Sequence, residues 1–175
     1  EPVLPARYVD AQPFADGVAW VRLPARASGA GASGTAPAWA LIDESGAVLI
    51  DPSAGLSDVR PFRRGLAAVA HRGYWGAVDT RGRVVVPFEY SGFVTALHDG
   101  RYVDGFTDGG FAVVERGGRR GVVDRTGRVV VPPVHAAVVI HPVAFLVTDG
   151  QRWGALDRQG RLLVDPSFPS RTGAA

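Results

Sequence analysis

The sequence predicts an all-β protein made of tandem three-stranded meanders. One short motif recurs four times, its flanking segments are rich in β-branched and aromatic residues, and the copies follow one another at a nearly regular interval. The clearest copy is residues 75–87, which read Trp-Gly-Ala-Val-Asp-Thr-Arg-Gly-Arg-Val-Val-Val-Pro. Repetition of this kind indicates an array of similar units and not a single irregular core.

Residues 75–87 have the composition of a β-hairpin. Residues 75–79 and 83–86 suit two short strands. Asp79 can accept backbone N–H bonds at the start of a type I turn, and Gly82 can adopt the left-handed conformation that returns the chain to the second strand. Pro87 lacks a backbone donor and ends the pairing.

The other copies are residues 39–52, 120–133 and 153–166. Their turn aspartates, together with Asp79, lie 36, 45 and 33 residues apart. The four turn aspartates are Asp43, Asp79, Asp124 and Asp157. A further strand precedes each hairpin, at residues 14–21, 62–69 and 106–113, with a shorter version at 144–147. The units therefore predict a propeller-like or rolled array, and the alternative is a β-solenoid or barrel-like arrangement.

Taken in order, the chain opens with residues 1–8, which look like the end of a unit. They predict a partial N-terminal unit, left by truncation or used to close a ring. Residues 24–38 are mostly small, with no large apolar side chain, and predict a flexible surface insertion. We expect one domain over residues 1–168, containing four units and the partial one, followed by a flexible tail at 169–175.

The units resemble the bacterial WG repeat, also written KWG. Its pattern runs roughly F-x-x-G-L-A-x-V, then W-G-x-I-D-x-x-G, an apolar strand and P-x-x-Y, and the likeness extends from about Tyr8 to Phe168. Ala40 replaces the glycine of the first copy and Arg120 the tryptophan of the third. The resemblance implies a repeat scaffold, often part of a larger bacterial protein. It implies no catalytic residues.

Composition excludes several classes of function. The chain has no cysteine, so thiolate chemistry, disulfides and zinc–sulfur sites are absent. Nineteen basic residues, all arginine, against 17 acidic ones give a net charge of only +2, which makes nucleic acid an unlikely partner. No apolar run is long enough to span a membrane. The compartment is not determined; the cytoplasm is slightly favoured because no signal peptide is visible, although the lack of methionine suggests a truncated or processed chain.

A second insertion, residues 95–104, carries the most varied chemistry. His98, Asp99, Arg101 and Tyr102 could gather at one rim of the array and bind a partner or ligand. The alternative is a solvated polar turn around Asp99. No ligand spacing recommends a metal site here.

The densest cationic segment offers a second candidate surface. It includes Arg119 and Arg120, which could bind an acidic ligand or simply form a solvated face. Calcium at the repeated aspartates is a further alternative, but each turn has a single aspartate, so turn capping is the better interpretation. The tryptophans Trp39, Trp75 and Trp153 predict a buried series, with an aromatic groove as the alternative.

Together these features predict a non-catalytic scaffold for protein–protein or ligand binding, without cofactor or metal. A protein or peptide is the expected partner. The sequence identifies no reaction and no catalytic residue, so it leaves open whether the protein is an enzyme and favours one that is not. The alternative is an accessory component of an enzyme or enzyme complex, whose loop at residues 95–104 contributes to a substrate site.

Overall fold

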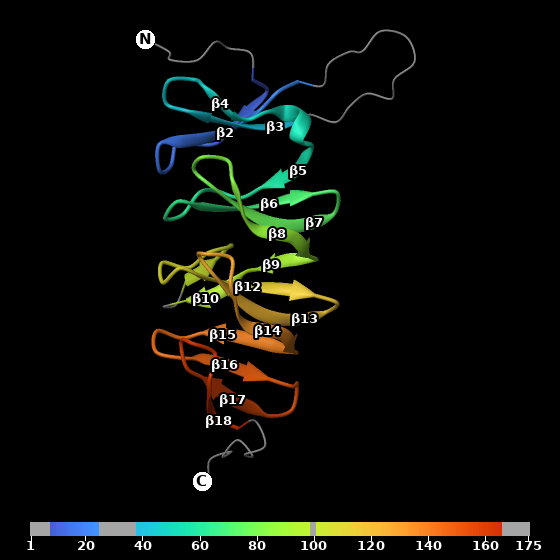
Figure 1. Ribbon diagram of the computed structural model, residues 1–175, viewed down its shortest axis with the longest axis vertical. Coiled ribbons are helices and arrows are strands. Elements are labelled where there is room, and N and C mark those ends of the chain that lie inside the picture. The colour runs from blue at the N-terminus through green and yellow to red at the C-terminus, as the bar shows by residue number, and fades with distance from the viewer. Residues whose placement is uncertain (1–7, 25–37, 99–100, 166–175) are drawn as a thin grey trace. The chain divides into compact units, whose positions relative to one another are not determined.

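The computed structural model describes residues 8–24, 38–98 and 101–165 (Figure 1). These residues form four antiparallel four-stranded sheets, one separate two-stranded hairpin and one 3₁₀ turn, η1 (Pro52–Ala54). The predicted all-β fold of tandem meanders is confirmed. The chain divides into two compact units between Phe88 and Glu89, and each unit is described by itself. The expected insertion at 24–38 and the tail at 169–175 lie almost wholly outside the described residues.

The first unit contains two sheets, in which strands follow one another in chain order. The strands of the first sheet are β1 (Asp10–Ala11), β2 (Val18–Arg22), β3 (Trp39–Asp43) and β4 (Val48–Ile50). Those of the second are β5 (Leu56–Val59), β6 (Leu66–His71), β7 (Tyr74–Asp79) and β8 (Val84–Tyr90). The predicted hairpin of residues 75–87 is β7 and β8, with the Asp79 turn between them.

The second unit repeats this plan with one addition. The first sheet has the order β14-β13-β12-β9 and the second β15-β16-β17-β18. The strands of the first are β9 (Gly92–Val94), β12 (Phe111–Arg116), β13 (Arg119–Asp124) and β14 (Val129–His135). Those of the second are β15 (Ala137–Ile140), β16 (Phe145–Thr148), β17 (Trp153–Leu156) and β18 (Leu162–Val164). The addition is a hairpin of β10 (Ala96–His98) and β11 (Arg101–Val103), inserted between β9 and β12.

Each sheet has one strand more than the three-stranded unit that the sequence predicts. The extra strands are β1, β5, β9 and β15, and each pairs antiparallel with the first predicted strand of its unit. Three of them are only two to four residues long and include polar residues or glycine, such as Leu-Ser-Asp-Val in β5. Such short edge strands carry little of the alternation by which a strand is identified from sequence.

In the first unit the two sheets pack face to face. Trp20, Leu41 and Ile50 are cross-strand neighbours on β2, β3 and β4 and are buried in one cluster with residues of the second sheet. The Trp20 ring stacks on Phe62 at 5.6 Å between centroids, and its Nε1 donates to the carbonyl oxygen of Arg60 at 3.0 Å. Apolar burial and this hydrogen bond together attach one repeat to the next.

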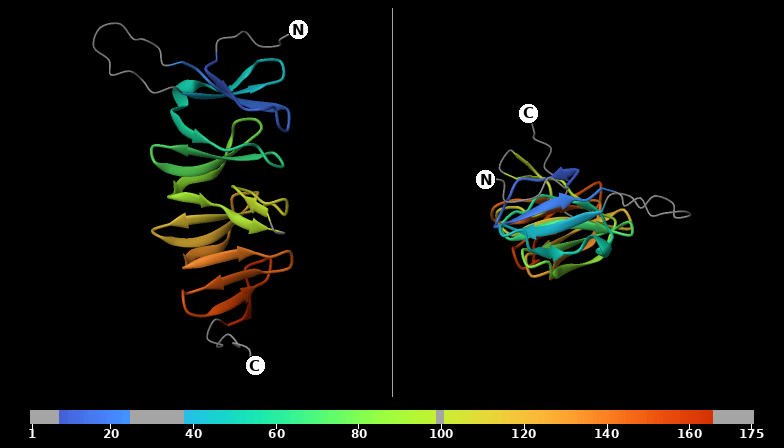
Figure 2. Two further views of the ribbon diagram at one scale, coloured as in Figure 1. Left: turned by 180° about the vertical axis from the view of Figure 1, so that it is seen from behind. Right: turned by 90° about the horizontal axis from the view of Figure 1, so that it is seen from above.

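The second unit has the same arrangement. Val113, Val122 and Val131 form one cross-strand row through β12, β13 and β14 and are almost fully buried. They share a cluster with five buried residues of the β15–β18 sheet: Val138, Ile140, Phe145, Val147 and Leu156. Figure 2 shows this pair of sheets from behind, one layer on the other.

Face-to-face packing of open sheets is common to propeller-like and solenoid-like arrays. No sheet among the described residues closes into a barrel. The propeller-like or rolled form, and a single domain over residues 1–168, therefore stay predictions.

Candidate functional site

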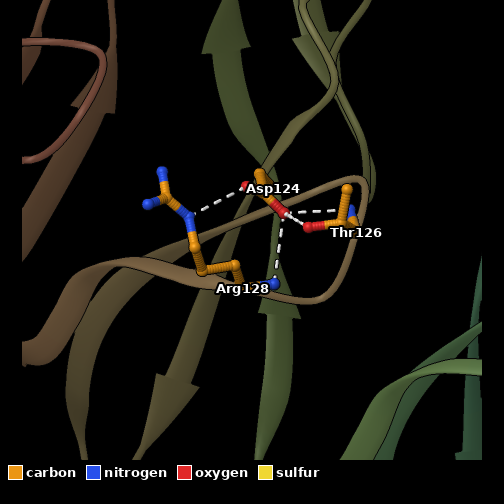
Figure 3. Close-up of polar contacts among 3 residues, drawn as sticks. All are labelled: Asp124, Thr126 and Arg128. Atoms are coloured by element: carbon orange, nitrogen blue, oxygen red, sulfur yellow. Dashed lines mark hydrogen bonds and ion pairs between the residues drawn. The ribbon is translucent and has the colours of Figure 1, made fainter.

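The repeated aspartate organises the turn between the two strands of each motif. At Asp124, Oδ1 accepts hydrogen bonds from Thr126 N at 2.9 Å, Thr126 Oγ1 at 2.6 Å and Arg128 N at 3.1 Å (Figure 3). The other oxygen, Oδ2, faces Arg128 Nε at 3.4 Å. The side chain thus satisfies two backbone donors of the turn and holds the guanidinium group of the returning strand.

The same geometry recurs at the other three turns. Oδ1 accepts from the backbone nitrogens two and four residues on: Ser45 and Ala47 for Asp43, Arg81 and Arg83 for Asp79, Gln159 and Arg161 for Asp157. A calcium ion needs several oxygen ligands, but here each carboxylate is engaged by donors. No group of three metal-ligating side chains occurs among the residues that the structure describes. The turn-capping interpretation accounts for all four aspartates.

These hydrogen bonds lower the pKa of every turn carboxyl. At Asp43 the Ser45 hydroxyl is the main cause, and at Asp157 the backbone N–H of Arg161. Partial desolvation raises the pKa of Asp79 and Asp124, but donors from the turn outweigh it and leave both values below normal. The carboxyls are therefore held as anions, which suits a cap and not a general acid.

The glycine that ends the turn lies against the preceding repeat. Gly82 has φ +77°, and a Cβ added to it would lie 2.7 Å from Ile50 Cγ1 and 3.0 Å from Leu49 O of β4. Gly160 lies in the same way against the Val130 carbonyl of β14. A side chain at either position would push the stacked sheets apart, so the glycine serves both turn and stacking.

The glycine at the second position of the motif, which follows Trp75 or Arg120, lies against the third strand of the unit. A Cβ on Gly76 would lie 2.5 Å from the Val86 carbonyl oxygen, and one on Gly121 would meet the Val131 carbonyl and, at 2.7 Å, Pro133 N. The first repeat has Ala40 at this position, and it is buried. Its third strand, β4, has three residues, whereas β8 and β14 have seven and continue past this glycine. The fourth repeat nevertheless keeps Gly154 although its third strand, β18, is equally short, so nothing in the structure explains the alanine.

The three motif tryptophans are not equally buried. Trp39 is 8% exposed, with the Arg22 guanidinium 5.7 Å from its ring centre. Trp75 is half-buried beneath Arg60, at 5.0 Å. Trp153, however, is 44% exposed. The predicted buried series is therefore wrong for Trp153, because in the described residues no further sheet covers β17.

The predicted loop residues belong to the β10–β11 hairpin of the second unit. His98 and Arg101 are cross-strand partners at its tip, Tyr102 pairs with Leu97, and Asp99 lies outside the described residues. Val103 and Phe106, which follow, are buried, and Phe106 packs on Phe93 at 5.9 Å. The hairpin therefore has an anchored base, and its tip brings His98 and Arg101 together.

The structure separates Arg119 and Arg120 from that hairpin. They begin β13, next to the β12–β13 turn. Because β9 pairs antiparallel with β12, the chain leaves Val94 toward β10 at the opposite end of β12. Figure 1 shows the hairpin and the β12–β13 turn at opposite ends of the strands of this sheet. The two candidate surfaces that the sequence predicts separately thus lie at opposite ends of β12.

The arginine segment is partly neutralised by carboxylates. Arg120 Nε lies 3.5 Å from Glu115 Oε2, and Arg116 Nη1 lies 3.3 Å from Glu89 Oε1. Arg119 is exposed. Three guanidinium groups face two carboxylates here, so an acidic ligand would compete with existing exposed ion pairs, each of which is weak.

Neither His71 nor His135 supports a reaction centre. His71 Nδ1 lies 3.2 Å from the Gly55 carbonyl oxygen and its ring contacts Phe88. It borders an open, mainly apolar depression in the first unit, with Leu56 and Val78. Burial lowers the pKa of His135, which keeps that ring neutral.

Among the described residues no helix is long and apolar enough to cross a membrane.

Comparison with known families gives a match to the model described as "WG containing repeat", over residues 1–23, 39–75 and 75–119. The third and fourth copies of the motif lie beyond these ranges, yet they have the same turn and the same sheet order as the others. A comparison with curated proteins finds no match. Over most of its length the chain repeats one turn, one glycine contact and one sheet, and it belongs to the WG containing repeat family.

Proposed function

We propose that the chain is a non-catalytic repeat scaffold that binds a protein or peptide, with the β10–β11 hairpin as its recognition element. The observation that carries this proposal is that the residues shared by the repeats are used for the fold. The repeated aspartates, glycines and Trp20 are occupied in turn capping and sheet stacking. Binding must then depend on residues that depart from the repeat.

The hairpin is such a departure. It is inserted into one sheet of the second unit, and the other three sheets have no counterpart among the described residues. Its base is fixed by buried Val103 and Phe106, while its tip pairs His98 with Arg101. A loop carried on a packed base is a common way to present binding residues.

Capture of partners by the full chain tests the proposal. A His98→Ala, Arg101→Ala, Tyr102→Ala variant should lose the proteins that the unaltered chain captures. A matched variant changes the same residue types at exposed positions elsewhere, His141, Arg152 and Tyr74, and should keep them. Equal capture by both variants would rule out the hairpin as the recognition element.

The arginine segment at Arg119 and Arg120 supports a second proposal, binding of an acidic ligand. Its signature would be affinity that falls steeply with salt and is lost in an Arg119→Ala, Arg120→Ala variant. The alternative role, as an accessory component of an enzyme, would be supported if the chain raised a partner's turnover and the hairpin variant did not.

A further inference from the structure

One face of the last sheet is apolar and open. Val139, Leu146, Ala155 and Val164 are successive cross-strand partners through β15, β16, β17 and β18. Trp153 precedes Ala155 by two residues and therefore shares its face. We call these five residues the end face. Leu146, Trp153 and Val164 are 36%, 44% and 48% exposed.

The same row is buried in the preceding repeat of this unit. There the corresponding partners through β9, β12, β13 and β14 are Val94, Val113, Val122 and Val131. Val113, Val122 and Val131 are at most 1% exposed because the β15–β18 sheet covers them. The end face thus has the composition of a stacking surface. It belongs to the β15–β18 sheet, and no described sheet covers it.

In the first unit, too, this cross-strand row is buried by another sheet. Trp20, Leu41 and Ile50 occupy the same row of the first sheet and are buried against the second. In both units, then, the occupant of this row is the face of another meander sheet. We propose that the end face docks on the end face of a second copy of this chain, forming a tail-to-tail dimer.

A second copy fits this surface better through the same face than through the opposite end of the chain. The outer face of the first sheet, made of Ala19, Val21, Ala40 and Ile42, is already buried, with Tyr8 and Leu23 packed against it. It is therefore closed to a head-to-tail contact. Pairing of two identical faces also gives a closed two-fold dimer, the commonest symmetry of homo-oligomers.

Charge does not oppose this pairing. None of the five end-face residues is ionisable, so two copies bring no like charges together at the centre. The Asp157–Arg161 ion pair borders one end of β17, and Asp149 and Arg152 precede the other. An apolar centre holding a tryptophan, with a rim of mixed charge, is the usual anatomy of an interface.

The dimer should be weak, because one four-stranded face is smaller than the roughly 800 Å² per partner of a standard interface. We therefore expect a Kd between about 10 µM and 1 mM. Sedimentation equilibrium of the full chain across that range measures it. Leu146→Arg should raise the Kd at least about tenfold, the scale of one central interface residue.

Val143→Arg is the matched control, since it places the same charge on an exposed apolar residue in the β15–β16 turn, off the end face. It should leave the Kd unchanged. Val164→Arg, on the edge strand, repeats the test if Leu146→Arg fails to fold. A chain that stays monomeric up to about 1 mM would overturn the proposal. So would a dimer that survives both end-face variants, or one that Val143→Arg weakens equally.

Discussion

Replacement of Gly121 by alanine should destabilise the second unit. The added Cβ would lie 2.7 Å from Pro133 N and 2.8 Å from Pro132 C, and would also meet the Val131 carbonyl oxygen. All three atoms are backbone, and the Val131 oxygen is the nearest, so β14 would have to retreat by at least about 0.7 Å to reach the 3.4 Å of ordinary contact. It cannot do so freely, because Val130 and Val131 are buried in the core of this unit.

The expected cost follows from two opposing effects. Overpacking of this kind costs about 1–3 kcal/mol. Replacing glycine by alanine also reduces the entropy of the unfolded chain, which returns about 0.4–1 kcal/mol. The net loss of unfolding free energy for Gly121→Ala should therefore be about 1–2 kcal/mol.

Gly92 provides a control in the same sheet. It lies on β9, its φ is not positive, and a Cβ there would meet nothing within 4 Å. Gly92→Ala should thus retain the entropic gain without the clash and leave stability unchanged or slightly raised. Urea unfolding followed by far-UV circular dichroism compares the variants, and hydrogen exchange of the β14 amides localises the effect. If Gly121→Ala were as stable as Gly92→Ala, the close approach of β14 could not be the reason for this glycine.

Further predictions concern the turns and the tryptophans. Asp124→Ala should lower the unfolding free energy by about 1 kcal/mol, the value of one net hydrogen bond, and calcium should not raise the melting temperature. The lowered pKa of Asp157 means that its stabilisation is complete above the unfolded value near 3.8 and is lost as the pH falls through the folded value. The melting-temperature difference between the unaltered chain and Asp157→Asn should therefore shrink below about pH 4. Trp20→Phe, which removes the 3.0 Å bond to Arg60 O, should cost about 1 kcal/mol in urea unfolding. Acrylamide should quench a fraction of the tryptophan emission that disappears in Trp153→Phe; undiminished quenching in that variant would contradict the exposure of Trp153.

The hairpins could be predicted because their signals are local. The Asp79 turn and the strands beside it are specified by residues within one stretch of the chain, and the structure confirms them. The extra strand of each sheet, the first in chain order, could not be predicted in this way. β5, for example, follows the 3₁₀ turn and pairs with β6 across the loop at residues 60–65, and its Ser57 and Asp58 give it no clear alternation.

The departures from the repeat illustrate the same limit. Ala40 in place of glycine looks like a defect when the copies are aligned. The structure explains the glycine and not its replacement: a Cβ on Gly76 would lie 2.5 Å from the Val86 carbonyl oxygen. Alignment of repeats shows which positions vary, but the reason for Gly76 lies in a neighbouring strand, ten residues further along the chain.

The candidate binding residues were harder still to place. His98 and Arg101 are joined by a hairpin whose pairing follows from a short local segment. Arg119 and Arg120 lie at the other end of β12, which only the antiparallel pairing of β9 with β12 decides. A list of chemically attractive residues therefore does not define one site until the direction of each strand is known.

Exposure in a repeat protein depends on the neighbour and not only on the residue. Trp39 and Trp153 occupy the same position of the motif, but Trp39 faces the second sheet, whereas no described sheet follows the one that contains Trp153. One is 8% and the other 44% exposed. The motif specifies which face a side chain joins, whereas the next sheet in the array specifies whether that face is covered. Sequence comparison among copies can predict the first property, and only the packing of the last sheet shows the second.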